Sequence, residues 1–119
     1  MITTLHIKQL ALSVNLGWRS KERDKEQAVF LDMIIRFNKA PIACDNDHLE
    51  DTQCYATLID HIRASIDTEH YKLIEHLAAE IYRIAQAMLP PGTRTQVGLT
   101  KFPKIGGLTG GVSFHYGDF

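Results

Sequence analysis

Residues 68–92 read TEHYKLIEHLAAEIYRIAQAMLPPG, the clearest periodic pattern in the chain. Its apolar side chains recur at steps of three and four residues, the spacing that lines up one face of a helix. These side chains are Ile74, Leu77, Ala78, Ile81, Ile84, Ala85 and Met88. The PPG sequence at 90–92 cannot continue a helix. The pattern therefore predicts a helix over residues 68–88.

A second amphipathic helix is predicted just before the first. It begins after Asp51, a residue type that caps helix N-termini. Apolar side chains again recur at helical spacing, at Tyr55, Leu58, Ile59, Ile62 and Ile66. Asp45, Asp47, Glu50 and Asp51 form an acidic run that leads into this helix, and we interpret the run as solvated surface.

Strands are predicted on both sides of the helices. Residues 27–38 alternate, with Val29, Leu31, Met33, Ile35 and Phe37 on one face. The first strand carries Leu10, Leu12, Val14 and Leu16 on one face, whereas Leu5 and Ile7 are out of phase. That change of phase indicates a bulge near Lys8 and Gln9. Residues 96–101 and 112–116 alternate as well, joined by a Gly- and Pro-rich loop.

The order strand–strand–helix–helix–strand–strand predicts an α+β fold. We expect a single domain over residues 1–119, with an antiparallel four-stranded sheet and both helices on one face. The uncovered face and the free strand edges then favour an oligomer.

The composition limits the partners. Thirteen basic and 14 acidic side chains leave a formal net charge of −1, so no strong field favours nucleic acid or a membrane surface. The opening MITTLHIKQL resembles no export leader, and no apolar run reaches the roughly 18 residues of a membrane span. Cys44 and Cys54 lack CxxC spacing and are expected to be reduced. We therefore expect a cytoplasmic protein.

No metal or nucleophile motif is present. The six histidines show neither HxxxH nor HExxH spacing, so we expect no metal site. No serine lies in a GxSxG elbow. GGLTGG at 106–111 departs from the phosphate-binding loop pattern, which favours a flexible connection.

Four polar residues are candidates for a site, each with a simpler structural alternative. Glu75 follows Ile74 and lies at the margin of the apolar stripe of the helix predicted over residues 68–88. Its carboxylate there either contacts a ligand or is a solvated helix side chain. Tyr55 lies on the other stripe, where a core tyrosine is the simpler interpretation. Lys101 is in phase with apolar strand residues, which indicates a cleft or a partner. Glu22 lies in a charged loop and by itself indicates only surface.

In this order, the motifs resemble the dihydroneopterin aldolase family along nearly the whole chain. They are Gly17, Glu22 and Gln27 in GWRSKERDKEQ, Tyr55 at the end of DNDHLEDTQCY, YKLIEHLAAEI with Ile74 and Glu75, Lys101 in LTKFP, and GGVSF. The resemblance implies the tunnelling fold, in which four subunits join their sheets into a barrel and two rings commonly stack as an octamer. Active sites would then lie at subunit interfaces.

The resemblance also implies the site and its reaction. Glu75 and the main chain of Ile74 would hold a pterin ring, and Tyr55 would arrive from a neighbouring subunit. Lys101 would move protons, and Glu22 would contact the substrate hydroxyl region. The implied reaction is retro-aldol cleavage of 7,8-dihydroneopterin in folate biosynthesis, without cofactor or metal. Some members also epimerise the side chain.

Departures from the family pattern keep alternatives open. Cys54 stands where the family usually has Asn or Asp, and Phe102 separates Lys101 from the following proline. Lys104 is the alternative position for the catalytic lysine. The other functional hypotheses are a dihydroneopterin triphosphate 2′-epimerase and a non-catalytic pterin-binding protein.

Overall fold

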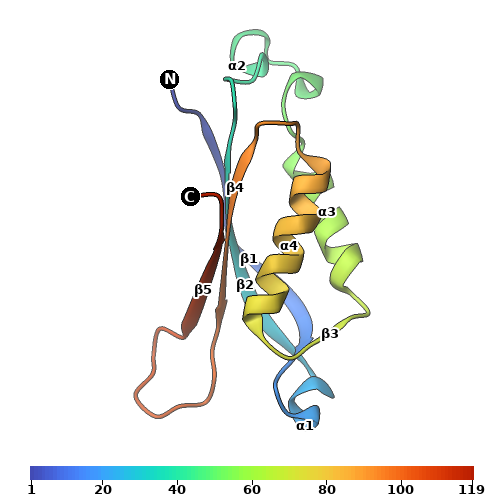
Figure 1. Cartoon of the computed structure of the whole chain (residues 1–119), viewed down its shortest axis with the longest axis vertical. Coiled ribbons are helices and arrows are strands. Elements are labelled where there is room, and N and C mark those ends of the chain that lie inside the picture. The colour runs from blue at the N-terminus through green and yellow to red at the C-terminus, as the bar shows by residue number, and fades with distance from the viewer.

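The computed structural model describes all 119 residues as one sheet with two long helices on one face (Figure 1). The helices are α3, Tyr55–Ile66, and α4, Ile74–Met88. The strands are β1, Thr4–Leu16; β2, Glu26–Arg36; β3, His70–Tyr71; β4, Arg94–Lys101; and β5, Val112–Gly117. Short helical turns lie at α1, Ser20–Arg23; α2, Ala43–Asn46; and η1, Leu49–Asp51. None of these helices combines the length and the hydrophobicity that a membrane-spanning helix needs.

The α+β prediction is confirmed, but the strand count is wrong. The sheet has five strands in the order β3-β1-β2-β4-β5, and it is mixed rather than purely antiparallel. The additional strand β3 pairs in parallel with the end of β1, through Asn15 with His70 and Leu16 with Tyr71. Two residues show no alternation by which a sequence pattern could reveal a strand.

Three element boundaries also differ from the prediction. Because residues 70–71 pair with β1, α4 begins at Ile74 and not at Thr68. Asp51 lies in η1 and does not cap α3, whose N-cap residue is Cys54. The loop predicted after Gly17 contains the single helical turn α1.

The predicted bulge in β1 is confirmed. The register between β1 and β2 shifts between Ile7 and Leu10, and Gln9 has a φ of 51°. A left-handed backbone is unfavourable for glutamine, but here its N–H donates a 3.0 Å hydrogen bond to Asp32 Oδ1. The bulge returns Ile7 to the same core as the later apolar residues of β1.

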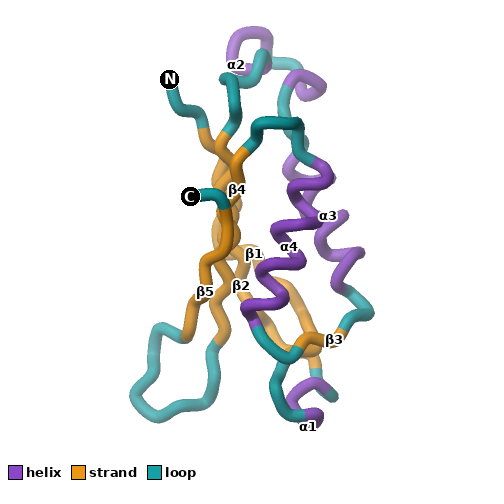
Figure 2. Tube along the Cα trace, viewed as in Figure 1, coloured by secondary structure: helices purple, strands orange, loops and turns teal.

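The core lies between the sheet and the two helices (Figure 2). It comprises 20 buried side chains, including Val29, Leu31, Met33 and Ile35 of β2 and most of the α4 stripe. Phe37, predicted on the same face, follows the end of β2 and is only partly buried. The opposite face of the sheet carries no helix, and Phe30, Asp32, Ile34 and Arg36 lie half-buried on it. The radius of gyration is 15.7 Å, above the about 13.5 Å typical of a compact chain of this length. The single chain is therefore elongated, at 50 × 30 × 21 Å.

Candidate active site

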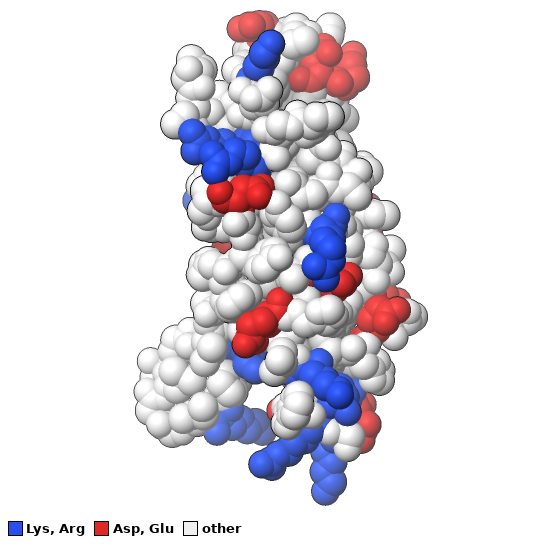
Figure 3. Space-filling view, viewed as in Figure 1, with Lys and Arg blue, Asp and Glu red and all other residues white.

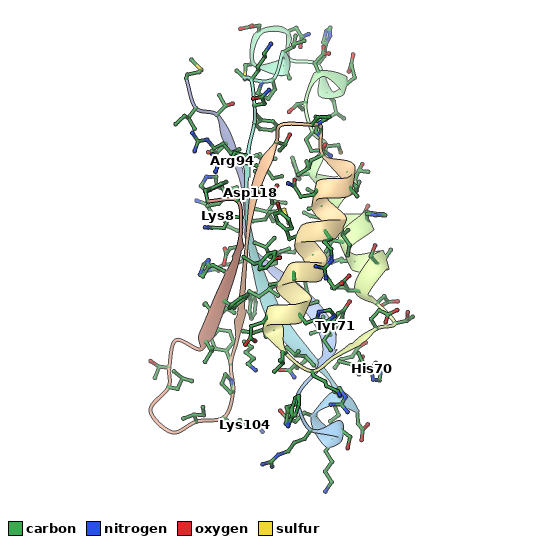
Figure 4. All side chains as sticks on the ribbon, in the orientation of Figure 1. Lys8, His70, Tyr71, Arg94, Lys104 and Asp118 are labelled. Atoms are coloured by element: carbon green, nitrogen blue, oxygen red, sulfur yellow. The ribbon has the colours of Figure 1, made fainter.

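Three of the four polar candidates lie at the same end of the molecule. We call this end the α1 pole, formed by α1, β3, the first turn of α4 and the last residue of β4 (Figure 1). Glu22 lies in α1, Glu75 in the first turn of α4, and Lys101 is the last residue of β4. Figure 4 shows Tyr71 and Lys104 at this end. Residues that are far apart in the sequence therefore lie at the same end of the sheet.

Glu22 is held by its contact with Gly17. A Cβ on Gly17 would lie 2.2 Å from Glu22 Cβ, so only glycine permits this approach. The Arg19 N–H donates a 3.2 Å hydrogen bond to Glu22 Oε1, and the Arg23 guanidinium donates to the carbonyls of Gly17 and Trp18. Glu22 remains exposed. The turn therefore presents a positioned carboxylate at the α1 pole.

Glu75 stands at an uncapped helix N-terminus. The N-cap residue of α4 is Leu73, which has no side chain able to accept from the first-turn N–H groups. Ile74 is buried at 3% exposure, whereas Glu75, a quarter turn further on, is exposed. The carboxylate and the free N–H groups can therefore face the same ligand. The predicted position on the margin of the apolar stripe is confirmed.

Lys101 continues the inward alternation of β4. Val97 and Leu99, at the same parity, are fully buried, and Lys101 is half-buried. Its amine is part of no ion pair or side-chain hydrogen bond in the structure. Lys104 is exposed in the loop that follows. Of the two lysines, Lys101 is thus the one placed against the helix-covered face.

Tyr55 does not lie at the α1 pole, and its interpretation as a core tyrosine is wrong. It is the first residue of α3 and is 58% exposed. A hollow of about 390 Å³ lies between α3 and the β1 edge. Tyr55 and Ile59 of α3 line one side, and residues 5–11 line the other. Because α3 and α4 run in opposite directions, Tyr55 and Glu75 lie at opposite ends of the helical layer (Figure 1). The 12 residues of α3 span roughly 18 Å.

Sequence reasoning overlooked two features near these candidates. The Lys72 ammonium lies 5.6 Å above the ring of the exposed Trp18 at the α1 pole, a contact that no local pattern indicates. Next to Tyr55, the pKa of the Cys54 thiol is lowered, chiefly by a hydrogen bond with the Thr57 side chain. Both cysteines are free thiols.

No three His, Cys, Asp or Glu side chains lie close enough together to hold a metal ion. The groups at the α1 pole include the carboxylates of Glu22 and Glu75, the half-buried amine of Lys101 and the main-chain N–H groups of α4. Such groups suit hydrogen bonding to a polar ring and proton transfer. The fold and these groups together define a small α+β domain whose candidate site is suited to acid–base chemistry.

Comparison with known proteins gives the family. Residues 5–116 match the family model for dihydroneopterin aldolase, and the chain belongs to that family. A probable dihydroneopterin aldolase of Chlamydia pneumoniae is 35% identical over 78 residues, which are 66% of this chain and 58% of that protein. A probable dihydroneopterin aldolase of Chlamydia trachomatis is 29% identical over 116 residues, which are 96% of this chain and 94% of that one.

A solved structure shares the fold over nearly the full length. The crystal structure of Escherichia coli dihydroneopterin aldolase in complex with neopterin superposes with a TM-score of 0.85. The match covers 98% of this chain and 99% of the other, at 19% sequence identity. This chain therefore shares the fold of the Escherichia coli protein over nearly its full length.

Proposed function

We propose that this chain is a 7,8-dihydroneopterin aldolase of folate biosynthesis, a lyase that works in the cytoplasm. It would release 6-hydroxymethyl-7,8-dihydropterin and glycolaldehyde. Family membership supports the reaction. The observation that carries the assignment to this chain is the placement of Glu75, at an uncapped helix N-terminus, at the same pole as the unpaired Lys101.

In this proposal Glu75 recognises the pterin. Its carboxylate accepts two hydrogen bonds, one from the amino group and one from the adjacent ring N–H, a bidentate geometry that suits a carboxylate. The main chain of Ile74 adds a contact to the same ring. Glu75 lies in the first turn of α4, where the positive end of the helix dipole interacts favourably with a carboxylate.

The chemistry needs proton transfer and an electron acceptor, and the substrate carries the acceptor. A proton leaves the hydroxyl on the second side-chain carbon, and the bond between the first two side-chain carbons breaks. The electron pair of that bond enters the ring C=N group, which gives an enamine, and the first carbon then takes a proton. Lys101 moves protons beside the ring, and Glu22 contacts the substrate hydroxyl region. No step calls for a cofactor.

We propose further that the site is completed by a second copy of the chain. The outer edge of β5 and the β1 edge before Asn15 have no strand partner. Tyr55 lies over that β1 edge, where a neighbour's β5 would arrive. In each copy Lys101 pairs with Val112 of β5, one strand in from the interface. Four copies joined in this way would close a barrel with the helices outside, and two rings would stack as an octamer.

The test is a product assay on purified protein with 7,8-dihydroneopterin. We expect glycolaldehyde and 6-hydroxymethyl-7,8-dihydropterin in equal amounts. Pterin binding that depends on Glu75, without any glycolaldehyde, would instead identify a non-catalytic pterin-binding protein.

A second candidate is the dihydroneopterin triphosphate 2′-epimerase. Basic side chains gather at the α1 pole in Figure 3, and Lys21 and Lys104 are exposed there. Arg23 is less available, because its guanidinium already donates to two carbonyls. Parallel assays with both substrates separate the candidates, since the epimerase would invert the triphosphate and release little glycolaldehyde.

A further inference from the structure

Two arginines face each other across neighbouring strands on the face of the sheet that carries no helix. Arg36, the last residue of β2, is the cross-strand partner of Arg94, the first residue of β4. Both have the opposite parity to the buried residues Ile35 and Val97, so their side chains lie on the helix-free face. Like charges directly opposite on paired strands destabilise a sheet.

No carboxylate neutralises this pair. The ion pairs in the structure join His48 to Glu50 and Asp51, and Arg83 to Glu80. Arg94 donates one 2.6 Å hydrogen bond to the main-chain carbonyl of Asp118 and lies 5.8 Å from the Phe119 ring centre. The carboxylate of the same residue, Asp118, is bound by Tyr82, Gln86 and the Thr95 N–H.

Arg36 is the more exceptional of the two. Its side chain is half-buried, yet the guanidinium takes part in no hydrogen bond or ion pair with the protein. A guanidinium has five N–H donors and no acceptor, and a buried arginine is normally paired. Five donors without a protein partner, next to a second cation, favour the binding of an anion.

A hollow of about 240 Å³ lies between the two arginines. No carboxylate takes part in its lining, and the other lining residues are Met1, Ile2, Phe37, Asn38 and Gly92. Gly92 has a φ of +84°, and a Cβ there would approach Asn38 Cγ to 3.0 Å, so the turn packs tightly over the Asn38 amide. The hollow therefore offers two guanidinium groups and an amide that can donate hydrogen bonds.

We propose that this hollow binds the phosphate group of a small phosphorylated molecule. Planar guanidinium groups match the oxygens of a phosphate, and each can donate two parallel hydrogen bonds. Arg94 and Lys101 are the first and last residues of β4, so roughly 23 Å of strand separates this hollow from the α1 pole. Figure 4 shows Arg94 and Lys104 at opposite ends of the sheet. The phosphate site is therefore distinct from the catalytic site proposed above.

Titration with inorganic phosphate tests the proposal, using the full chain at constant ionic strength in a chloride buffer. Calorimetry should detect binding, and the Nε–H resonances of arginine should shift. Arg36→Gln and Arg94→Gln should each weaken binding at least tenfold, the effect of losing a charge-assisted hydrogen bond. Lys8→Gln, a change of equal charge at an exposed residue outside the hollow, should leave it unchanged. Equal binding by all three variants would overturn the proposal.

Thermal melting gives a second readout. Phosphate should raise the melting temperature of the wild-type protein but not of Arg36→Gln. In chloride alone, Arg36→Gln should melt at the same or a higher temperature, because it removes the repulsion. A lower melting temperature would mean that Arg36 has a structural role, and the proposal would fail.

A remaining occupant is the acidic segment 45–51 of a second copy. Two results together would establish that alternative and reject our proposal. Phosphate would fail to bind the wild-type protein, and Arg36→Gln would change the sedimentation of the protein. Cleavage of dihydroneopterin by Arg36→Gln should stay at the wild-type rate, so the phosphate site and the aldolase activity are tested independently.

Discussion

The Tyr82 hydroxyl on α4 donates a 2.5 Å hydrogen bond to Asp118 Oδ1, beyond the end of β5. The other carboxylate oxygen accepts from the Thr95 N–H at 2.9 Å and from Gln86 at 3.3 Å. One carboxylate therefore ties α4 to the start of β4 and to the end of the chain. Because α4 carries Glu75 and β4 carries Lys101, this contact helps to set the two candidate site residues relative to each other.

Tyr82→Phe should destabilise the protein by about 1–2 kcal/mol, because it removes a hydrogen bond to a carboxylate and keeps the ring. Urea unfolding measures the change. Tyr116→Phe is the matched control, since the Tyr116 ring packs edge-on against Tyr82 at 5.4 Å but is 39% exposed. An equal loss in both variants would show that the hydroxyl of Tyr82 contributes nothing.

Stability should fall as the pH rises through about 10. The pKa of Tyr82 is raised, first by its hydrogen bond to Asp118, and burial raises the pKa of Tyr71. Above the ordinary tyrosine pKa of about 10, the unfolded chain loses these protons while the folded chain keeps them. The unfolded state is therefore favoured progressively until the folded pKa values are passed. Denaturant unfolding between pH 8 and 11 should show this slope, and Tyr82→Phe should flatten it.

Lys101→Ala should reduce the turnover of dihydroneopterin by about 10²–10⁴-fold, the usual contribution of a general acid–base group. Lys104→Ala, three residues away in the exposed loop, should retain most of the activity. Single-turnover kinetics would locate the loss in the chemical step. The reverse pattern, with Lys104→Ala inactive and Lys101→Ala normal, would assign the role to Lys104.

Glu75→Gln should weaken pterin binding by roughly 10–100-fold, because an amide cannot accept both hydrogen bonds that a carboxylate accepts. The binding of neopterin, followed by fluorescence, is the direct measurement. Glu69→Gln removes an exposed carboxylate that precedes α4 and should bind as the wild type does. Unchanged affinity in Glu75→Gln would reject its role in recognition.

Mixed assemblies should show that the site is shared. Tyr55 and Glu75 lie at opposite ends of the helical layer, so one chain cannot bring both to one ligand. Tyr55→Phe and Glu75→Ala proteins, each inactive, should regain some activity when unfolded and refolded together, because some interfaces then carry both native residues. A fully active monomer in sedimentation at assay concentration would contradict the shared site.

The elements whose side chains follow a period could be predicted from the amino-acid sequence. The alternation of β2 predicted its buried residues, and the stripe of α4 predicted the face that covers the sheet. The change of phase at Lys8 and Gln9 located the bulge, because one extra residue in a strand reverses every side chain after it. The helical period placed Glu75 next to the buried stripe of α4, and the strand period placed Lys101 in phase with the buried residues of β4.

The features that depend on a residue far away in the chain could not be predicted in this way and are seen only in the folded protein. His70 and Tyr71 form a strand because Asn15 and Leu16 lie beside them, and that pairing delays the start of α4. Tyr55 is exposed because α3 reaches beyond the core at its first turn, which no period reveals. The contact of Tyr82 with Asp118 and the pairing of Arg36 with Arg94 join residues 36 and 58 positions apart. Periodicity reports which way a side chain points from its own element, whereas the neighbour it meets is set by strand order and register, which are properties of the folded chain.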